Sequence, residues 1–158
     1  MADQLADTRN IRTLTIVELF TRECLGIEVG LSLRAEHIVA AMNRLKHDRG
    51  LPQRITTDNG SNFSGAQMDL WAYTNQVRMD FSRRGKPTDN AIVESLNGRL
   101  CEECMNARWF ESLADASEKF DAWGSDYSEN RPHRFLEDMT PRDYAVKQAL
   151  TGVANSQT

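Results

Sequence analysis

Residues 55–63, Ile-Thr-Thr-Asp-Asn-Gly-Ser-Asn-Phe, are the stretch around which the sequence is organised. The run before Asp58 is rich in β-branched side chains and predicts a short strand. The Asn-Gly pair after Asp58 predicts a turn, so Asp58 stands at the end of the predicted strand. Residues 86–99, Lys-Pro-Thr-Asp-Asn-Ala-Ile-Val-Glu-Ser-Leu-Asn-Gly-Arg, predict a turn that leads into a helix, with Glu94 near the start of that helix.

Asp58 and Glu94 are separated by 35 residues. A carboxylate at the end of a strand and a second carboxylate on a helix can converge on one divalent cation. Metal-assisted phosphoryl chemistry uses such pairs, because hard cations prefer oxygen ligands. The two side chains are therefore candidate metal ligands and catalytic residues.

Three strings carry a family resemblance: TDNGSNF at 57–63, RGKPTDNAIVESLNGRL at 84–100 and YSENRPHRFLEDMTPRDY at 127–144. In this order they resemble the catalytic core of bacterial insertion-sequence transposases, which belong to the retroviral-integrase-like group. The resemblance extends from about residue 5 to residue 145. Asn-Gly alone would carry no weight, because it is a common turn dipeptide.

The resemblance implies an α/β fold of the ribonuclease-H-like class. Its mixed five-stranded sheet has three antiparallel strands, then parallel strands, and is flanked by helices. The implied activity is cleavage and joining of DNA phosphodiesters, with transposon ends and target DNA as partners. The implied cofactors are Mg²⁺ or Mn²⁺ ions held by an Asp-Asp-Glu triad, and Asp58 and Glu94 match its last two members.

The first triad aspartate has no evident match. By the resemblance, it lies on the first strand, four residues before the position that Asp3 matches, so it would fall before Met1 together with most of that strand. Two hypotheses follow: an active core whose site is completed by Asp3 or by a partner's residue, or a catalytically inactive ribonuclease-H-like remnant that binds nucleic acid or protein. A related ribonuclease-H-like nuclease would share the acidic site, but residues 127–144 do not support it.

A shortened first strand would leave one edge of the sheet open. Unpaired strand edges pair readily with another chain, and residues 12–20 would form that edge. We therefore expect a homodimer or a larger assembly.

The composition of the 158 residues is typical of one soluble globular domain, with 40% hydrophobic and 27% charged residues. We expect residues 1–150 to form the domain and residues 151–158 to be a frayed tail. No apolar run is long enough to span a membrane, and the polar N-terminal residues do not resemble a secretory signal, so we expect a cytoplasmic protein. The net charge of −4 is unfavourable for binding DNA phosphates.

Hydrophobic periodicity, caps and turn residues predict the elements along the chain. A strand, a helix and a strand across 54–82 predict a parallel crossover. The predicted elements are the remnant of a strand at 3–5, strands at 12–20 and 22–29, a helix from Ser32 to Gly50, a strand at 54–57, a helix at 65–76, a strand at 77–82, a long helix capped by Thr88 or Asp89, a helix at 113–127 and a last helix starting at Thr140-Pro141.

A basic window at 78–86 is the first candidate DNA-binding segment in this acidic chain. Arg83, Arg84 and Lys86 could hold a DNA backbone there, and the alternative is a solvated loop tip. Asn90 and Asn97 lie one turn before and after Glu94 on the same helix face, and are further candidates for DNA contacts.

Other polar and aromatic residues favour structural roles. Cys101 and Cys104 have the spacing of metal ligands, but no second pair exists, so we expect two free thiols beside the core. We expect His37 and His47 to face solvent and the aromatic residues of 113–127 to enter the core. The His133 region is expected to dock the C-terminal segment.

Overall fold

The computed structural model describes residues 2–57, 65–81 and 90–156. The elements agree closely with those predicted from the sequence. In chain order they are β1 (Ala2–Gln4), β2 (Asn10–Val17), β3 (Cys24–Gly30), α1 (Ala35–Arg49), β4 (Arg54–Thr57), α2 (Ala66–Asn75), β5 (Arg78–Phe81), α3 (Ala91–Leu100), the π-helical turn η2 (Cys101–Met105), α4 (Leu113–Glu129), the 3₁₀ turn η3 (Arg134–Leu136) and α5 (Pro141–Ser156).

The strands form two sheets. β1, β2 and β3 are antiparallel neighbours in that order, and β4 pairs with β5 in parallel, as the predicted crossover requires. We expected one five-stranded sheet, whereas the described strands form a three-stranded sheet and a separate two-stranded sheet. The reason lies in β1, which is three residues long and pairs only with Asn10–Arg12 of β2, so the described strands contain no link from the antiparallel strands to β4.

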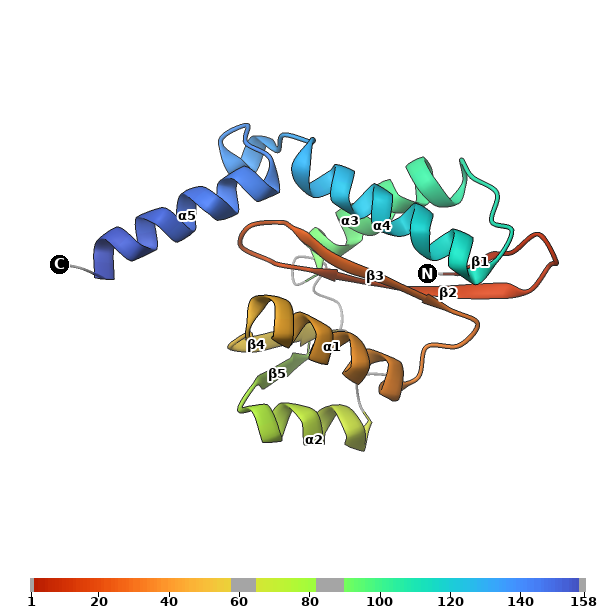
Figure 1. The fold of residues 1–158 in the computed structure, drawn as a ribbon, viewed down its shortest axis with the longest axis horizontal. Helices are drawn as coiled ribbons and strands as arrows, with labels where there is room; N and C mark the ends of the chain where they lie inside the picture. Colours follow the sequence, from red (N-terminus) through yellow and green to blue (C-terminus); the bar gives the residue numbers. More distant parts are fainter. Residues whose placement is uncertain (1, 58–64, 82–89, 157–158) are drawn as a thin grey trace.

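Helices cover both faces of the antiparallel sheet. α3 and α4 lie on one face, while α1 lies on the other with β4, β5 and α2 beyond it, and α5 extends away from the body (Figure 1). Alternate residues of β2 face the two sides. Ile11 enters an apolar cluster with Leu96, Leu100 and Phe120, whereas Leu14 and Ile16 pack against a second cluster on the α1 side.

Most predicted helix ends are confirmed. Gly50 ends α1 with a φ of 84°, and its N–H donates to the Lys46 carbonyl. Thr140 caps α5, since its hydroxyl accepts the Asp143 N–H at 3.1 Å. Ser32 was the wrong cap for α1: the helix starts one residue after Arg34, whose N–H donates to Nδ1 of His37.

The C-terminal helix is longer than expected. α5 continues to Ser156, beyond the boundary at Leu150 that we predicted for a frayed tail. The Thr151 hydroxyl donates to the Lys147 carbonyl along the helix. Ala149 and Ala154 favour helix in this stretch.

Several predicted side-chain environments are confirmed. His37 and His47 are exposed, and the aromatic side chains of α4 are buried. Cys104 is buried, Cys101 is half-buried, and both are free thiols. Within the described part of the chain, no helix is both long enough and apolar enough to cross a bilayer.

Candidate functional site

Helix α3 presents Glu94 to solvent. The buried residues Leu96 and Leu100 fix one face of the helix against the sheet, which turns Glu94 outward. Among the described residues, the Glu94 carboxylate forms no hydrogen bond or ion pair, while the Glu94 backbone N–H donates to the Asn90 carbonyl at 2.9 Å. An exposed carboxylate without a protein partner is free to bind a cation or a ligand.

Asn97 fixes the position of this helix on the sheet. Its side-chain carbonyl accepts the hydroxyl of Thr15 from β2 at 2.6 Å. Glu94 therefore lies one helical turn from a rigid contact with the central strand. Asn97, which we predicted as a DNA contact, thus has a structural partner, and its role toward DNA stays a prediction.

Asp3 lies on β1. Burial raises the pKa of the Cys104 thiol, Arg108 and Lys119 lower it, and the Asp3 carboxylate raises it. One cation needs its oxygen ligands within about 2.6 Å of it. No contact of the described residues joins Asp3 to Glu94, and the role of Asp3 in a metal site stays a prediction.

The pairing of β1 with β2 indicates where a third carboxylate would fit. Asp3 is paired with Ile11, four residues along β2 from Thr15. Thr15 points to the α3 face, because it donates to Asn97. An acidic side chain paired opposite Thr15 would lie one helical turn from Glu94.

The remaining predicted residues divide into two groups. Asp58, Arg83, Arg84 and Lys86 lie outside the described residues, as do the proposed caps Thr88 and Asp89. Asn90 occupies the cap position of α3 and is half-buried. In residues 2–57, 65–81 and 90–156, no three His, Cys, Asp or Glu side chains form a metal-ligand group.

Carboxylate chemistry nevertheless fits a hard divalent cation. The Glu94 side chain is exposed, and no Lys, Arg or His side chain of the described residues forms an ion pair with its carboxylate. Its oxygen atoms are therefore suitable ligands for such a cation. The cysteine pair does not supply an alternative site, because Cys104 is buried and burial raises the pKa of its thiol.

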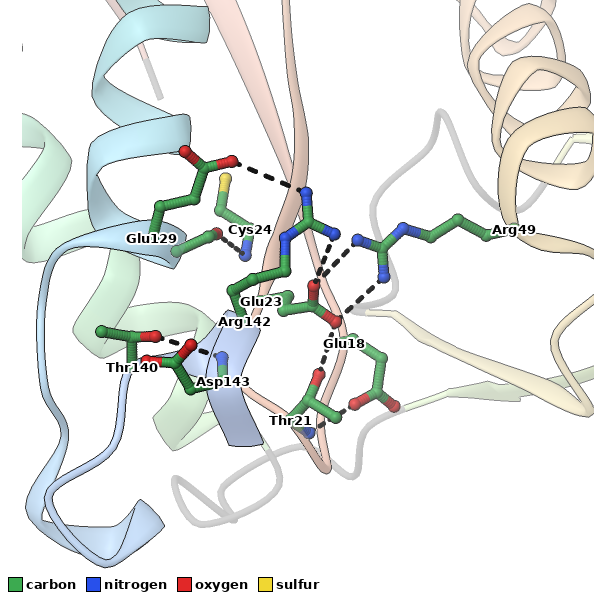
Figure 2. Close-up of polar contacts among 10 residues, drawn as sticks. Glu18, Thr21, Glu23, Cys24, Arg49, Glu129, Thr140, Arg142 and Asp143 are labelled. Carbon is green, nitrogen blue, oxygen red and sulfur yellow. Dashed lines mark hydrogen bonds and ion pairs between the residues drawn. The ribbon is translucent and has the colours of Figure 1, made fainter. Parts of the chain in front are cut away.

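The sequence did not predict a second acidic centre at Glu23. Figure 2 shows its carboxylate between Arg49 at the end of α1 and Arg142 at the start of α5. Arg49 donates two hydrogen bonds at 2.8 and 2.9 Å, Thr21 donates one at 3.0 Å, and Arg142 lies at 3.7 Å. Burial favours a raised pKa for Glu23, but the bonds and charge of Arg49 outweigh it and lower that pKa.

A pocket of about 270 Å³ lies beside this network, between β3 and α4. Cys24 lines it, and burial raises the pKa of its thiol to about 11, so the thiol is unreactive at neutral pH. Glu94 is not among the lining residues. No local sequence signal marks the network, since its members come from elements far apart in the chain.

Family comparisons agree with this architecture. A model described as integrase core domain matches residues 3–87, and a second model with the same description matches residues 75–141. An uncharacterized 31.7 kDa protein of insertion element IS407 from Burkholderia multivorans is 38% identical over 152 residues, which cover 96% of this chain and 55% of that protein. An uncharacterized 39.2 kDa protein of IS476 from Xanthomonas euvesicatoria is 34% identical, with 91% and 42% covered.

The chain thus spans about half the length of these curated relatives. A third relative, the transposase of IS904 from Lactococcus lactis, is 30% identical over 91 residues, covering 57% of this chain and 36% of the relative.

Solved structures share the fold at low identity. The HTLV-2 integrase catalytic core, solved with magnesium in a trimeric form, gives a TM-score of 0.67 at 13% identity, with 91% of this chain and 90% of that chain covered. The BIV integrase core gives 0.64 at 13%, with 97% and 95% covered. The predicted mixed α/β, ribonuclease-H-like fold is confirmed, and the chain belongs to the integrase core domain family found in insertion-element transposases.

Proposed function

We propose that this chain is the part of an insertion-element transposase that binds DNA and carries carboxylates for strand cleavage and joining. The observation that carries the proposal is Glu94, an exposed carboxylate without a described partner on a helix fixed to β2 by the Asn97–Thr15 bond. Support also comes from the IS904 relative, which is named a transposase.

In this proposal Asp58 and Glu94 hold Mg²⁺ or Mn²⁺. The bound metal would activate the attacking oxygen and stabilise the leaving oxygen of the phosphodiester. The protein's own contribution is to hold Glu94 on a rigid element, because an error of about 1 Å in position can cost about 10²-fold in rate. Arg83, Arg84, Lys86, Asn90 and Asn97 are proposed to contact DNA.

In this proposal Asp3 or a partner's residue completes the metal site. The pairing of Asp3 with Ile11 favours a carboxylate paired opposite Thr15, such as one from a partner chain. A second copy of the chain remains a proposed partner, in line with the dimeric and trimeric forms named for the HTLV-2 integrase core.

The pairing of Asp3 with Ile11 rather than with Thr15 also favours a second candidate function. Without a third carboxylate the chain would bind DNA but not cleave it. The two candidates differ in one measurable property, which is metal-dependent nicking.

A plasmid-nicking assay in Mn²⁺ separates them. We expect the chain to nick supercoiled DNA, Glu94→Gln to abolish nicking and Glu102→Gln, an exposed neighbour on the next turns, to leave it unchanged. Equal activity in the protein and in Glu94→Gln would reject the proposed catalytic role of Glu94. DNA binding without nicking in any variant would favour the second candidate.

A further inference from the structure

A buried polar atom near the end of α4 lacks a hydrogen-bond partner. His133 is fixed by a backbone bond from its N–H to the Met139 carbonyl at 2.9 Å, and its ring meets the Tyr127 ring edge-on at 4.9 Å. The His133 Nε2 atom is buried without a hydrogen bond. Tyr127, whose ring lies against it, is 5% exposed. Buried polar atoms are nearly always satisfied, so the unpaired Nε2 atom indicates a missing partner.

The helix packing brings Arg99 to this place. Cys104 of η2 lies 4.0 Å from the Lys119 carbonyl, and Glu103 accepts the Trp123 indole N–H at 3.0 Å, so η2 runs antiparallel to α4. Arg99 lies one turn before Glu103, and Tyr127 lies one turn after Trp123. Arg99 is therefore level with Tyr127.

The turn between β2 and β3 brings Arg22 to the same end of α4. Cys24, two residues further on, donates its N–H to the Ser128 hydroxyl at 3.0 Å, next to Tyr127. Arg22 has a φ of 65°, a left-handed conformation that costs energy in a residue other than glycine. Its N–H is held by the Glu18 carbonyl at 2.8 Å.

The charges at this place are unbalanced. Arg131 is paired with Glu103 and Asp126, but neither Arg22 nor Arg99 has an ion pair within the described residues. Burial lowers the pKa of His133, and Arg99, Arg22 and Arg131 lower it further, so the ring is neutral at pH 7. Burial raises the pKa of Tyr127, although the same arginines oppose the shift. Arg22 and Arg99 thus add positive charge near a neutral imidazole and a tyrosine hydroxyl, both of which can donate hydrogen bonds.

We propose that Arg22, Arg99, Tyr127 and His133 form a binding site for one phosphate group of the DNA backbone. Guanidinium groups bind phosphate oxygens in a bidentate manner, and the tyrosine hydroxyl and an imidazole N–H would complete the shell. Arg99 is five residues from Glu94, about 7.5 Å along the helix axis and about 140° around it, so the site would hold the DNA backbone at a different face of α3 from the proposed cleavage site. This inference rests on the proposed function.

The first test uses inorganic phosphate and NMR spectra of the imidazole groups. The chain has three histidines, and His133→Gln assigns the relevant signals. We expect phosphate to shift the His133 signals in the protein and in Arg9→Gln, whose arginine is paired with Asp7 at the turn after β1. Arg22→Gln and Arg99→Gln should weaken the phosphate affinity at least several-fold, with unchanged urea midpoints as evidence of folding. No shift in the protein would overturn the site.

The second test measures duplex DNA binding by fluorescence anisotropy over a range of salt concentrations. Loss of one phosphate contact should reduce the slope of log K against log[salt] by about 0.9 in Arg99→Gln but not in Arg9→Gln. Equal slopes would overturn the DNA assignment and leave the proposed function intact, with any phosphate shift then assigned to free phosphate. Phosphate binding without any DNA binding would support the anion site and reject the proposed function.

Discussion

Glu23 and Glu94 are two glutamates in opposite surroundings. Glu23 is 2% exposed and is bound by Arg49 and Thr21, with Arg142 nearby, whereas Glu94 is exposed and has no described partner. The Glu23 carboxylate links α1 and α5 to the start of β3, so its interactions contribute to the free energy of unfolding. The second contributes no described contact, which is what a ligand-binding carboxylate requires. The difference separates an acid that joins elements of the fold from one that we propose as a metal ligand.

The largest expected effect is at Glu23. Glu23→Ala should lower the free energy of unfolding by about 2 kcal/mol, because it removes the two charge-assisted hydrogen bonds from Arg49 and the one from Thr21. Glu94→Ala should change stability by no more than about 0.5 kcal/mol. Urea unfolding of both variants measures the difference, and equal losses would contradict the assigned roles.

A smaller effect on stability should distinguish glycine substitutions in α4 from those in α3. A Cβ at Gly124 of α4 would lie 3.2 Å from the Cys24 sulfur, but a Cβ at Gly98 of α3 meets nothing within 4 Å. Gly124→Ala should therefore cost about 1–2 kcal/mol by overpacking, and Gly98→Ala should stabilise by about 0.5–1 kcal/mol.

Adding Cys24→Ala should relieve the overpacking. The double variant with Gly124→Ala should then lose less stability than the sum of the single variants. Strict additivity in urea unfolding would show that the close approach of α4 to β3 is not the cause.

The hydrogen bond between Thr15 and Asn97, which fixes α3 on β2, should contribute about 1 kcal/mol to the free energy of unfolding. Asn97→Ala and Thr15→Val each remove the 2.6 Å hydrogen bond, so the double variant should lose little more than either alone. Ser95→Ala, at an exposed position of the same helix, is the control. Independent, additive losses in a double-mutant cycle would show that the two side chains do not interact.

Acid should weaken the Glu23 network. The folded pKa of Glu23 lies below its ordinary 4.5, because the bonds and charge of Arg49 outweigh the effect of burial. The carboxylate therefore stabilises the fold above pH 4.5 and loses this contribution as pH falls from 4.5 through the lower folded pKa. The stability difference between the protein and Glu23→Gln should shrink over that range of pH. A constant difference would show that the charge of Glu23 is not responsible.

The sequence predicted local structure better than long-range contacts. Turn and cap signals such as Gly50 and Thr140-Pro141 act within a few residues, so the elements were predicted nearly in full. The network of Glu23 with Arg49 and Arg142 joins positions 26 and 119 residues apart, and no local pattern indicates it.

The candidate site shows the same difference between local sequence signals and long-range contacts. Glu94 was identified from its motif, and the structure adds that it is exposed. The register of β1, which pairs Asp3 with Ile11 rather than with Thr15, could not be predicted from the sequence alone, and the role of Asp3 stays a prediction.

The most direct test of the account is a calorimetric titration of Mn²⁺ into the protein, Asp58→Asn, Glu94→Gln and the exposed control Glu102→Gln. We predict saturable binding in the protein and in the control, and its loss in both Asp58→Asn and Glu94→Gln, because one cation shared by the two carboxylates needs both. Binding that persists unchanged in either variant, or no binding in the protein itself, would contradict the claim that Asp58 and Glu94 form a metal site in this chain.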